Sequence, residues 1–109
     1  MAITSFTADN LVTATKKLIT EKSLQLESGQ SIVRGEVLAK GTTGLVKLAL
    51  VTDTPYCIAL QTIDATAAAK DVTYTKDGSV LNSKLTYAVG TIADFRDGFA
   101  TSTNLLIEE

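Results

Sequence analysis

The stretch SGQSIVRGEVLA, residues 28–39, contains two glycine turns, and a short apolar run follows each of them. Gly29 and Gly35 can supply the positive φ that tight turns require, because glycine has no β-carbon. We therefore expect Ile32, Val37 and Leu38 to insert into a core while the chain turns sharply between them. A ribbon folded in this way is typical of a small all-β domain.

Further strands are predicted on both sides of this stretch. Leu24 and Leu26 alternate with polar residues before it. After it, strand-like segments separated by turn residues occur at 45–51, 56–63, 72–75, 80–81, 85–89 and 105–107. The close spacing of these segments again favours a small all-β barrel or a folded ribbon.

Three connections have a composition of their own. The segment KDGS, residues 76–79, has the composition of a hairpin turn. The Ala-rich residues 64–70 predict a connection with one helical turn at most. One short helix is expected over 92–97, with Thr91 as its N-cap and Gly98 just beyond its end.

The 109 residues fit one domain, and 45% of them are hydrophobic, which is enough for a core. We divide the chain into an N-terminal arm, residues 1–22, and a single β domain, residues 23–109. The arm has only partial helical periodicity, and Ile3 to Thr7 alternates apolar and polar residues as a strand does. A domain of this size is often stabilised by association with other chains.

Charge and composition exclude several classes of partner. The net charge is −2 and no basic block is present, so we expect no nucleic-acid partner. No apolar run approaches the roughly 20 residues of a membrane helix, and no signal peptide is recognisable, so we expect no membrane partner and synthesis in a cytoplasm.

The sequence offers little for catalysis. Histidine is absent, and the lone Cys57 lies in an apolar run, where it is expected to be a small buried hydrophobic residue. Structural zinc and calcium sites both need ligand sets that are missing here, so we predict no metal, no cofactor and no enzyme. The loop from Gly41 to Gly44 lacks the ending of a phosphate-binding loop and is expected to be a tight strand connection.

Three stretches taken in order resemble the bacteriophage lambda-type head decoration proteins. They are residues 28–39 with the glycine-bounded loop after them, residues 55–78, and residues 80–85 with the short helix and strand that follow. The resemblance covers roughly residues 23–109. It implies a β-clip or β-tulip-like small barrel with an N-terminal arm, and a homotrimer without catalytic residues.

The resemblance also implies a place of action. Such proteins bind the major capsid protein on the outside of an expanded phage head, at three-fold positions, and stabilise the head against internal DNA pressure. The protein is then part of the virion and is made in the host cytoplasm. In this reading residues 2–20 hold the shell and the β body forms the trimer, and the alternative is that the arm packs on its own barrel. The expected capsid contacts are Ala2, Ile3, Thr4, Ser5, Phe6 and Thr7.

One alternative stays open from the sequence. The glycine rhythm of residues 29–38 also occurs in biotinyl and lipoyl carrier domains, and the turn at Arg34-Gly35-Glu36 is of a type shared by small binding domains related to antifreeze proteins. A small β-barrel binding module that recognises a small ligand or another protein is therefore the second interpretation.

Overall fold

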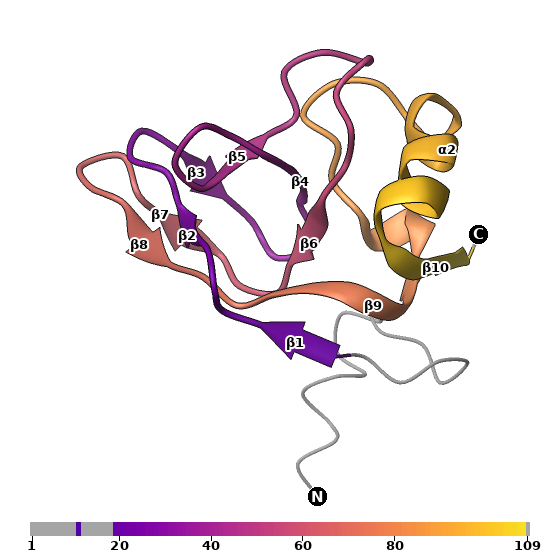
Figure 1. Cartoon of the computed structure of the whole chain (residues 1–109), viewed down its shortest axis with the longest axis horizontal. Coiled ribbons are helices and arrows are strands. Elements are labelled where there is room, and N and C mark those ends of the chain that lie inside the picture. Colours follow the sequence, from indigo (N-terminus) through magenta and orange to yellow (C-terminus); the bar gives the residue numbers. More distant parts are fainter. Residues whose placement is uncertain (1–10, 12–18, 109) are drawn as a thin grey trace, which may run out of the picture.

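The computed structural model describes Leu11 and residues 19–108. Short strands and one α-helix follow one another along the chain (Figure 1). In chain order they are β1 (Ile19–Glu21), β2 (Gln25–Leu26), β3 (Ser31–Ile32), β4 (Val37–Lys40), β5 (Leu45–Lys47), β6 (Cys57–Ala59), β7 (Ile63–Asp64), β8 (Lys70–Asp71), β9 (Tyr74–Leu81), the 3-10 turn η1 (Asn82–Lys84), α2 (Ile92–Ser102) and β10 (Asn104–Glu108). Over Leu11 and residues 19–108 the fold is mostly β with one short α-helix, as the sequence predicts.

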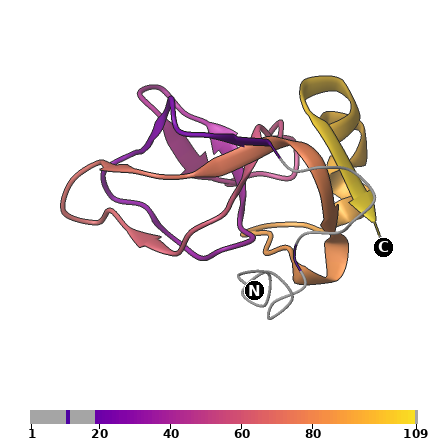
Figure 2. The ribbon, with the colours of Figure 1, turned by 90° about the horizontal axis from the view of Figure 1, so that it is seen from below.

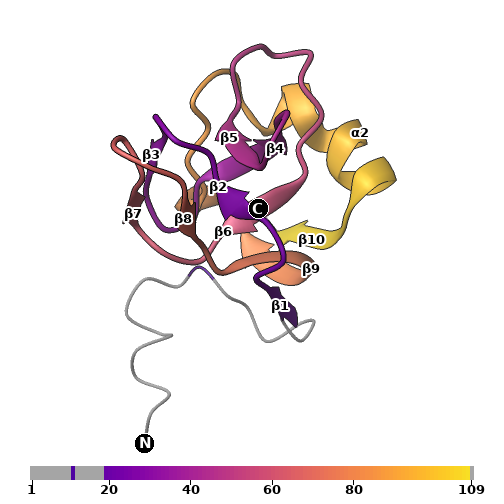
Figure 3. The same ribbon diagram turned by 60° about the vertical axis from the view of Figure 1, so that its left-hand side comes forward.

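The main sheet has the strand order β1-β9-β6-β4-β5-β2-β8, and β10 adds to it as a parallel partner of β9. The strands β3 and β7 form a separate antiparallel pair, which lies at the end of the molecule opposite α2 (Figures 1 and 3). Among the described strands the sheet does not close on itself, since β1 and β8 at its two ends do not pair. A closed barrel is therefore not what these strands form.

Both faces of the central strands β4 and β6 are buried. Because successive side chains on a strand point to opposite faces, Leu38 and Cys57 pack on one side while Val37 and Ile58 pack on the other. The first core cluster comprises Leu26, Ile32, Leu38, Leu45, Cys57, Ala59, Ala65, Val72 and Tyr74. The second core cluster comprises Leu11, Val37, Ala39, Leu48, Ile58, Val80, Phe95 and Phe99.

The helix α2 covers the second core cluster. Phe95 and Phe99 are four residues apart, so both point from one face of the helix into the cluster. Figure 2 shows α2 and β10 side by side at one end of the molecule. The helix begins as predicted after Thr91, whose backbone N–H donates to Asp94 Oδ2 at 2.8 Å.

The predicted end of this helix is wrong. The helix continues through Gly98 to Ser102 and ends at Thr103, whose backbone is extended, with φ of −136° and ψ of 168°. Gly98 is needed for a different reason, because a β-carbon there would stand 2.5 Å from Pro55 Cδ. The glycine lets the helix approach Pro55 closely.

The predicted hairpin at residues 76–79 is also wrong. These residues lie inside β9, which runs without interruption from Tyr74 to Leu81. The strand is paired on both edges at this point, because Asp77 faces Ile19 of β1 and also Asn104 of β10. Pairing with these distant strands overrides the local turn composition, although Gly78 does keep a positive φ of 127°.

Other strand predictions are only partly right. The segment 45–51 is a strand only as far as Lys47, and the segment 85–89 contributes a single bridge, from Thr86 to Glu36, after the turn η1. The turns at Gly29 and Gly35 are confirmed, with φ of 94° and 92°. The predicted core insertions of Ile32, Val37 and Leu38 are confirmed as well.

Candidate functional site

The predicted capsid contacts Ala2, Ile3, Thr4, Ser5, Phe6 and Thr7 lie outside the described residues. The structure does describe how the segment predicted as an arm joins the rest of the chain. Leu11 is buried in the second core cluster, and β1 pairs antiparallel with β9. Two points of the first 22 residues are therefore attached to the body of the protein.

The pairing of β1 with β9 contains a bulge. Ile19 faces Asp77 and Thr20 faces Thr75, so Lys76 is the extra residue on β9. The buried Thr75 hydroxyl oxygen lies 2.6 Å from the Ile19 carbonyl oxygen and 2.7 Å from that of Asp77, and it thus braces the bulge. Thr75 lies in the strand predicted over residues 72–75, and no local pattern in the sequence indicates that its hydroxyl braces a bulge.

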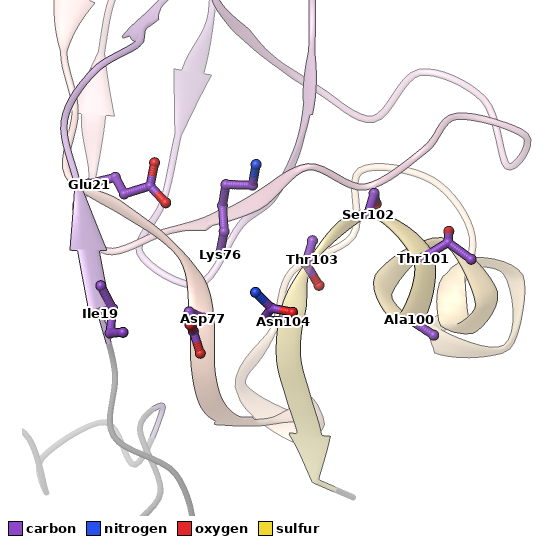
Figure 4. A pocket seen from close by; sticks show the side chains of 9 residues that line it. All are labelled: Ile19, Glu21, Lys76, Asp77, Ala100, Thr101, Ser102, Thr103 and Asn104. Atoms are coloured by element: carbon purple, nitrogen blue, oxygen red, sulfur yellow. The ribbon is translucent and has the colours of Figure 1, made fainter.

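A polar groove of about 340 Å³ lies beside the bulge (Figure 4). Its walls come from β1, from the bulged part of β9, and from the corner where α2 passes into β10. The lining residues are Ile19, Glu21, Lys76, Asp77, Ala100, Thr101, Ser102, Thr103 and Asn104. Hydroxyl, amide and oppositely charged groups are mixed here, so the lining differs from the mostly apolar lining that is typical of small-ligand pockets.

Lys76, which lines this groove, also contacts an aromatic side chain. Its ammonium nitrogen lies 3.9 Å from the centroid of the Tyr56 ring, and that of Lys40 lies 6.0 Å from the same centroid. Attraction between an ammonium and the face of an aromatic ring holds Lys76 in a defined position. Tyr56 itself is half-buried.

Two exposed large apolar side chains lie next to each other at the tip of the loop between β5 and β6. Leu50 is 62% exposed and Val51 is 49% exposed. The Asp53 carboxylate fixes this tip by accepting the backbone N–H groups of Ala49 and Leu50 at 2.8 and 2.9 Å, and these bonds lower the pKa of Asp53. A fixed loop with exposed apolar side chains can bind a protein partner at a small cost in conformational entropy.

The loop from Gly41 to Gly44 does not hold an open anion site. The Glu27 carboxylate accepts the backbone N–H groups of Thr43 and Gly44 at 2.9 and 3.0 Å. This side chain occupies the donors that a phosphate would need. The loop is a tight strand connection, as predicted.

Two titratable side chains, those of Cys57 and Glu36, are buried in the body of the protein. Cys57 is fully buried in the first core cluster, and burial raises the pKa of its thiol. Burial also raises the pKa of Glu36.

Across Leu11 and residues 19–108, no group of three or more His, Cys, Asp or Glu side chains could hold a metal ion. Over the same residues, no helix is both long and apolar enough to span a membrane.

Comparison with known proteins gives one family. The model of the family described as bacteriophage lambda head decoration protein D matches residues 1–103 of this chain. Since this match covers nearly the whole sequence, the chain belongs to that family, a family of viral structural proteins and not of enzymes. No curated protein matches the chain significantly.

Proposed function

We propose that this protein binds the outer surface of an expanded phage head as a trimer at three-fold positions and stabilises the head against internal DNA pressure. The observation that carries the proposal is the family match over residues 1–103. The protein then acts on the virion after synthesis in the host cytoplasm, with the major capsid protein and two further copies of itself as partners. Neither nucleic acid nor a membrane is needed as a partner.

The geometry of the described residues supports this assignment. The exposed apolar side chains of Leu50 and Val51, held on a loop that Asp53 fixes, are a feature of protein-binding surfaces. The β-clip or β-tulip fold belongs to the same proposal. Its support is the sharply turned ribbon of β2, β3 and β4, with positive φ at Gly29 and Gly35.

The proposed grip on the shell is the N-terminal arm with Ala2, Ile3, Thr4, Ser5, Phe6 and Thr7. An alternating segment of this kind can add as a strand to an exposed sheet edge of a capsid protein. Three arms on one trimer bind together, so each contact can be weak on its own. The division between an arm at residues 1–22 and a body at residues 23–109 is part of this proposal.

The test uses empty expanded phage heads that lack their decoration protein. The full chain should sediment with these heads, should run as a trimer in size-exclusion chromatography with light scattering, and should raise the temperature at which the heads break. Unexpanded heads serve as the control and should not bind. A monomer that ignores expanded heads, and whose melting temperature rises with a small ligand, would instead favour the binding module.

The positions of Leu11 and β1 determine which truncation is a clean test of the N-terminal arm as the capsid contact. A deletion of residues 2–20 would remove the buried Leu11 and two residues of β1, so loss of binding could result from a damaged body. A deletion of residues 2–10 spares both points of attachment. We expect this shorter variant to fold and to trimerise but to lose binding to the heads, and normal decoration by it would refute the grip.

A further inference from the structure

Two lysine side chains meet at the half-buried ring of Tyr56. The ammonium nitrogen of Lys76 lies 3.9 Å from the ring centroid, and that of Lys40 lies 6.0 Å from the same point. The two nitrogens are therefore at most about 10 Å apart, a separation at which like charges repel each other. The lysines come from different strands, β9 and the end of β4, and only the fold brings them together.

The fold holds Lys76 in a defined position. It is the extra residue of the bulge on β9, and a bulge of this kind redirects a side chain. The buried Thr75 hydroxyl braces the bulge through its contacts with the carbonyl oxygens of Ile19 and Asp77. In Figure 4 the Lys76 side chain extends away from that of Asp77 on the same strand. The ammonium group is thus already positioned in the unbound protein, so little conformational entropy is lost when it binds an anion.

Acidic side chains lie near these lysines but do not neutralise them. Glu21 and Asp77 line the groove beside Lys76, yet neither forms an ion pair with it. Asp53 lines a neighbouring hollow of about 320 Å³ that Lys40 also lines, but its carboxylate already accepts two backbone N–H groups. Over Leu11 and residues 19–108, then, no carboxylate is paired with either lysine.

We propose that Lys40 and Lys76 bind an acidic side chain of the capsid protein, with its carboxylate held between the two ammonium groups beside Tyr56. This inference rests on the proposed function and names the chemistry of one contact on the partner. Charge complementarity carries it, because two adjacent cations without a carboxylate partner in the described part of the chain attract an anionic group. The groove and the neighbouring hollow adjoin at Ser102, which lines both, so a protein surface has room to reach the lysines.

The surrounding charges favour a carboxylate on a protein over a polyanion. Glu21 and Asp77 line the same groove as Lys76. Nucleic acid carries a row of phosphates, and its further negative charges would be repelled by these two carboxylates. A single acidic side chain brings one negative charge to the lysines and avoids this repulsion.

The first experiment compares two double variants of the full chain in binding to empty expanded heads. Lys40→Gln with Lys76→Gln removes the proposed contact, whereas Lys70→Gln with Lys84→Gln makes the same change in net charge at exposed lysines of β8 and η1. At low salt we expect the first variant to bind about tenfold more weakly than the native chain and to lose part of the salt dependence of binding. The second variant should bind nearly as the native chain does. Equal losses in the two variants would overturn the contact.

A substitution that conserves the charge separates binding from a purely structural role of Lys76. Lys76→Arg keeps a cation for the Tyr56 ring and for a carboxylate, whereas Lys76→Gln removes the charge. We expect the arginine variant to bind the heads like the native chain and the glutamine variant to bind more weakly, with both fully folded by circular dichroism at the assay temperature. Equal weakening in the two variants would mean that the shell does not recognise the charge, and this result would refute the proposal.

A measurement without heads separates this inference from the proposed function. A short glycine- and serine-rich peptide with two adjacent glutamates is titrated into the isotope-labelled protein. At millimolar peptide the amide signals of Lys40, Tyr56 and Lys76 should shift in the native chain and not in the double variant Lys40→Gln with Lys76→Gln. The absence of these shifts, or equal shifts with a peptide that carries lysines instead, would overturn the contact even if the chain decorates heads. If the peptide binds but expanded heads do not, the proposed function fails, together with the capsid as the partner, and the carboxylate site stands.

Discussion

Gly98 shows how one residue can reverse an ordinary helix preference. Within a helix, alanine is normally better than glycine by about 1 kcal/mol. Here a β-carbon would stand 2.5 Å from Pro55 Cδ and 3.0 Å from Pro55 Cγ. We therefore expect Gly98→Ala to lower the free energy of unfolding by about 1–3 kcal/mol, measured by urea denaturation, because the helix must move away from Pro55.

The control for this prediction removes the obstacle. In a Pro55→Ala background the ring atoms are gone, so Gly98→Ala should become neutral or stabilising. Destabilisation of the same size in both backgrounds would show that the close approach to Pro55 is not the cause. The Ser102 hydroxyl, which donates to the Pro55 carbonyl at 2.7 Å, keeps its partner in both variants.

Glu36 gives a prediction about pH. Burial raises the pKa of its carboxyl group, with the backbone at Val33 and the charge of Lys47 acting in the opposite direction. Since the folded-state pKa lies above the unfolded one, the contribution of Glu36 to stability is fully present below the unfolded pKa and is lost as pH rises through the folded pKa. Charged Glu36 thus weakens the fold at neutral pH.

The substitution Glu36→Gln removes this titration and keeps a side chain that can accept a hydrogen bond. We expect the variant to gain stability over the native chain at pH 7 and to lose that advantage near pH 4, by urea midpoints at both values. Asp53 supplies a contrast, because its pKa is lowered by hydrogen bonds from Ala49 and Leu50. An advantage of Glu36→Gln that is larger at pH 4 than at pH 7 would contradict the assigned direction.

At the scale of elements, local sequence patterns predicted the turns and element ends that depend on interactions between nearby residues. The turns at Gly29 and Gly35, the start of α2 at Thr91 and the closing strand β10 follow from glycine conformation, capping and a short apolar run. The hairpin at residues 76–79 failed because its composition competes with pairing to β1 and β10, which lie near opposite ends of the chain. Such pairing leaves no signal within a window of a few residues.

The two faces of β10 give a matched test of its packing. Ile107 packs against the second core cluster, whereas Leu106, one residue earlier, is 42% exposed. We expect Ile107→Ala to lower the free energy of unfolding by about 2 kcal/mol and Leu106→Ala to change it by less than about 0.5 kcal/mol. Equal effects of the two substitutions, measured by thermal and urea unfolding, would contradict the register of β10 on β9.

At the scale of the whole molecule, the candidate surfaces depend on contacts between distant parts of the chain. The polar groove exists because β1, β9 and the corner of α2 and β10 meet, and Leu11 is buried in a cluster whose other members come from β4, β6, β9, α2 and the loop after β5. The sequence could assign the β class, the buried Cys57 and the family resemblance. It could not give the groove, the bulge at Lys76 or the burial of Leu11, since each needs partners that only the tertiary fold brings together.

Cys57 offers a probe of the whole molecule, because β6 lies in the interior of the sheet between β4 and β9 and the thiol is fully buried. A thiol reagent should reach it only when the body unfolds, so labelling of the native protein should be slower than labelling in urea by about 10³-fold or more. Burial also keeps the thiol protonated by raising its pKa, which slows the reaction further.

The same reaction tests association, because any partner that binds only the folded protein lowers the unfolded population by mass action. If the protein forms trimers, labelling of Cys57 should slow as protein concentration rises, and it should slow again when expanded heads are added in excess. The control is Cys57→Ala combined with Ser28→Cys, which places the thiol on an exposed turn and should react quickly under all these conditions. A Cys57 rate that is independent of protein concentration would indicate a monomer. A rate unchanged by saturating heads would contradict binding through the folded body, since binding to the folded state must slow every reaction that requires unfolding.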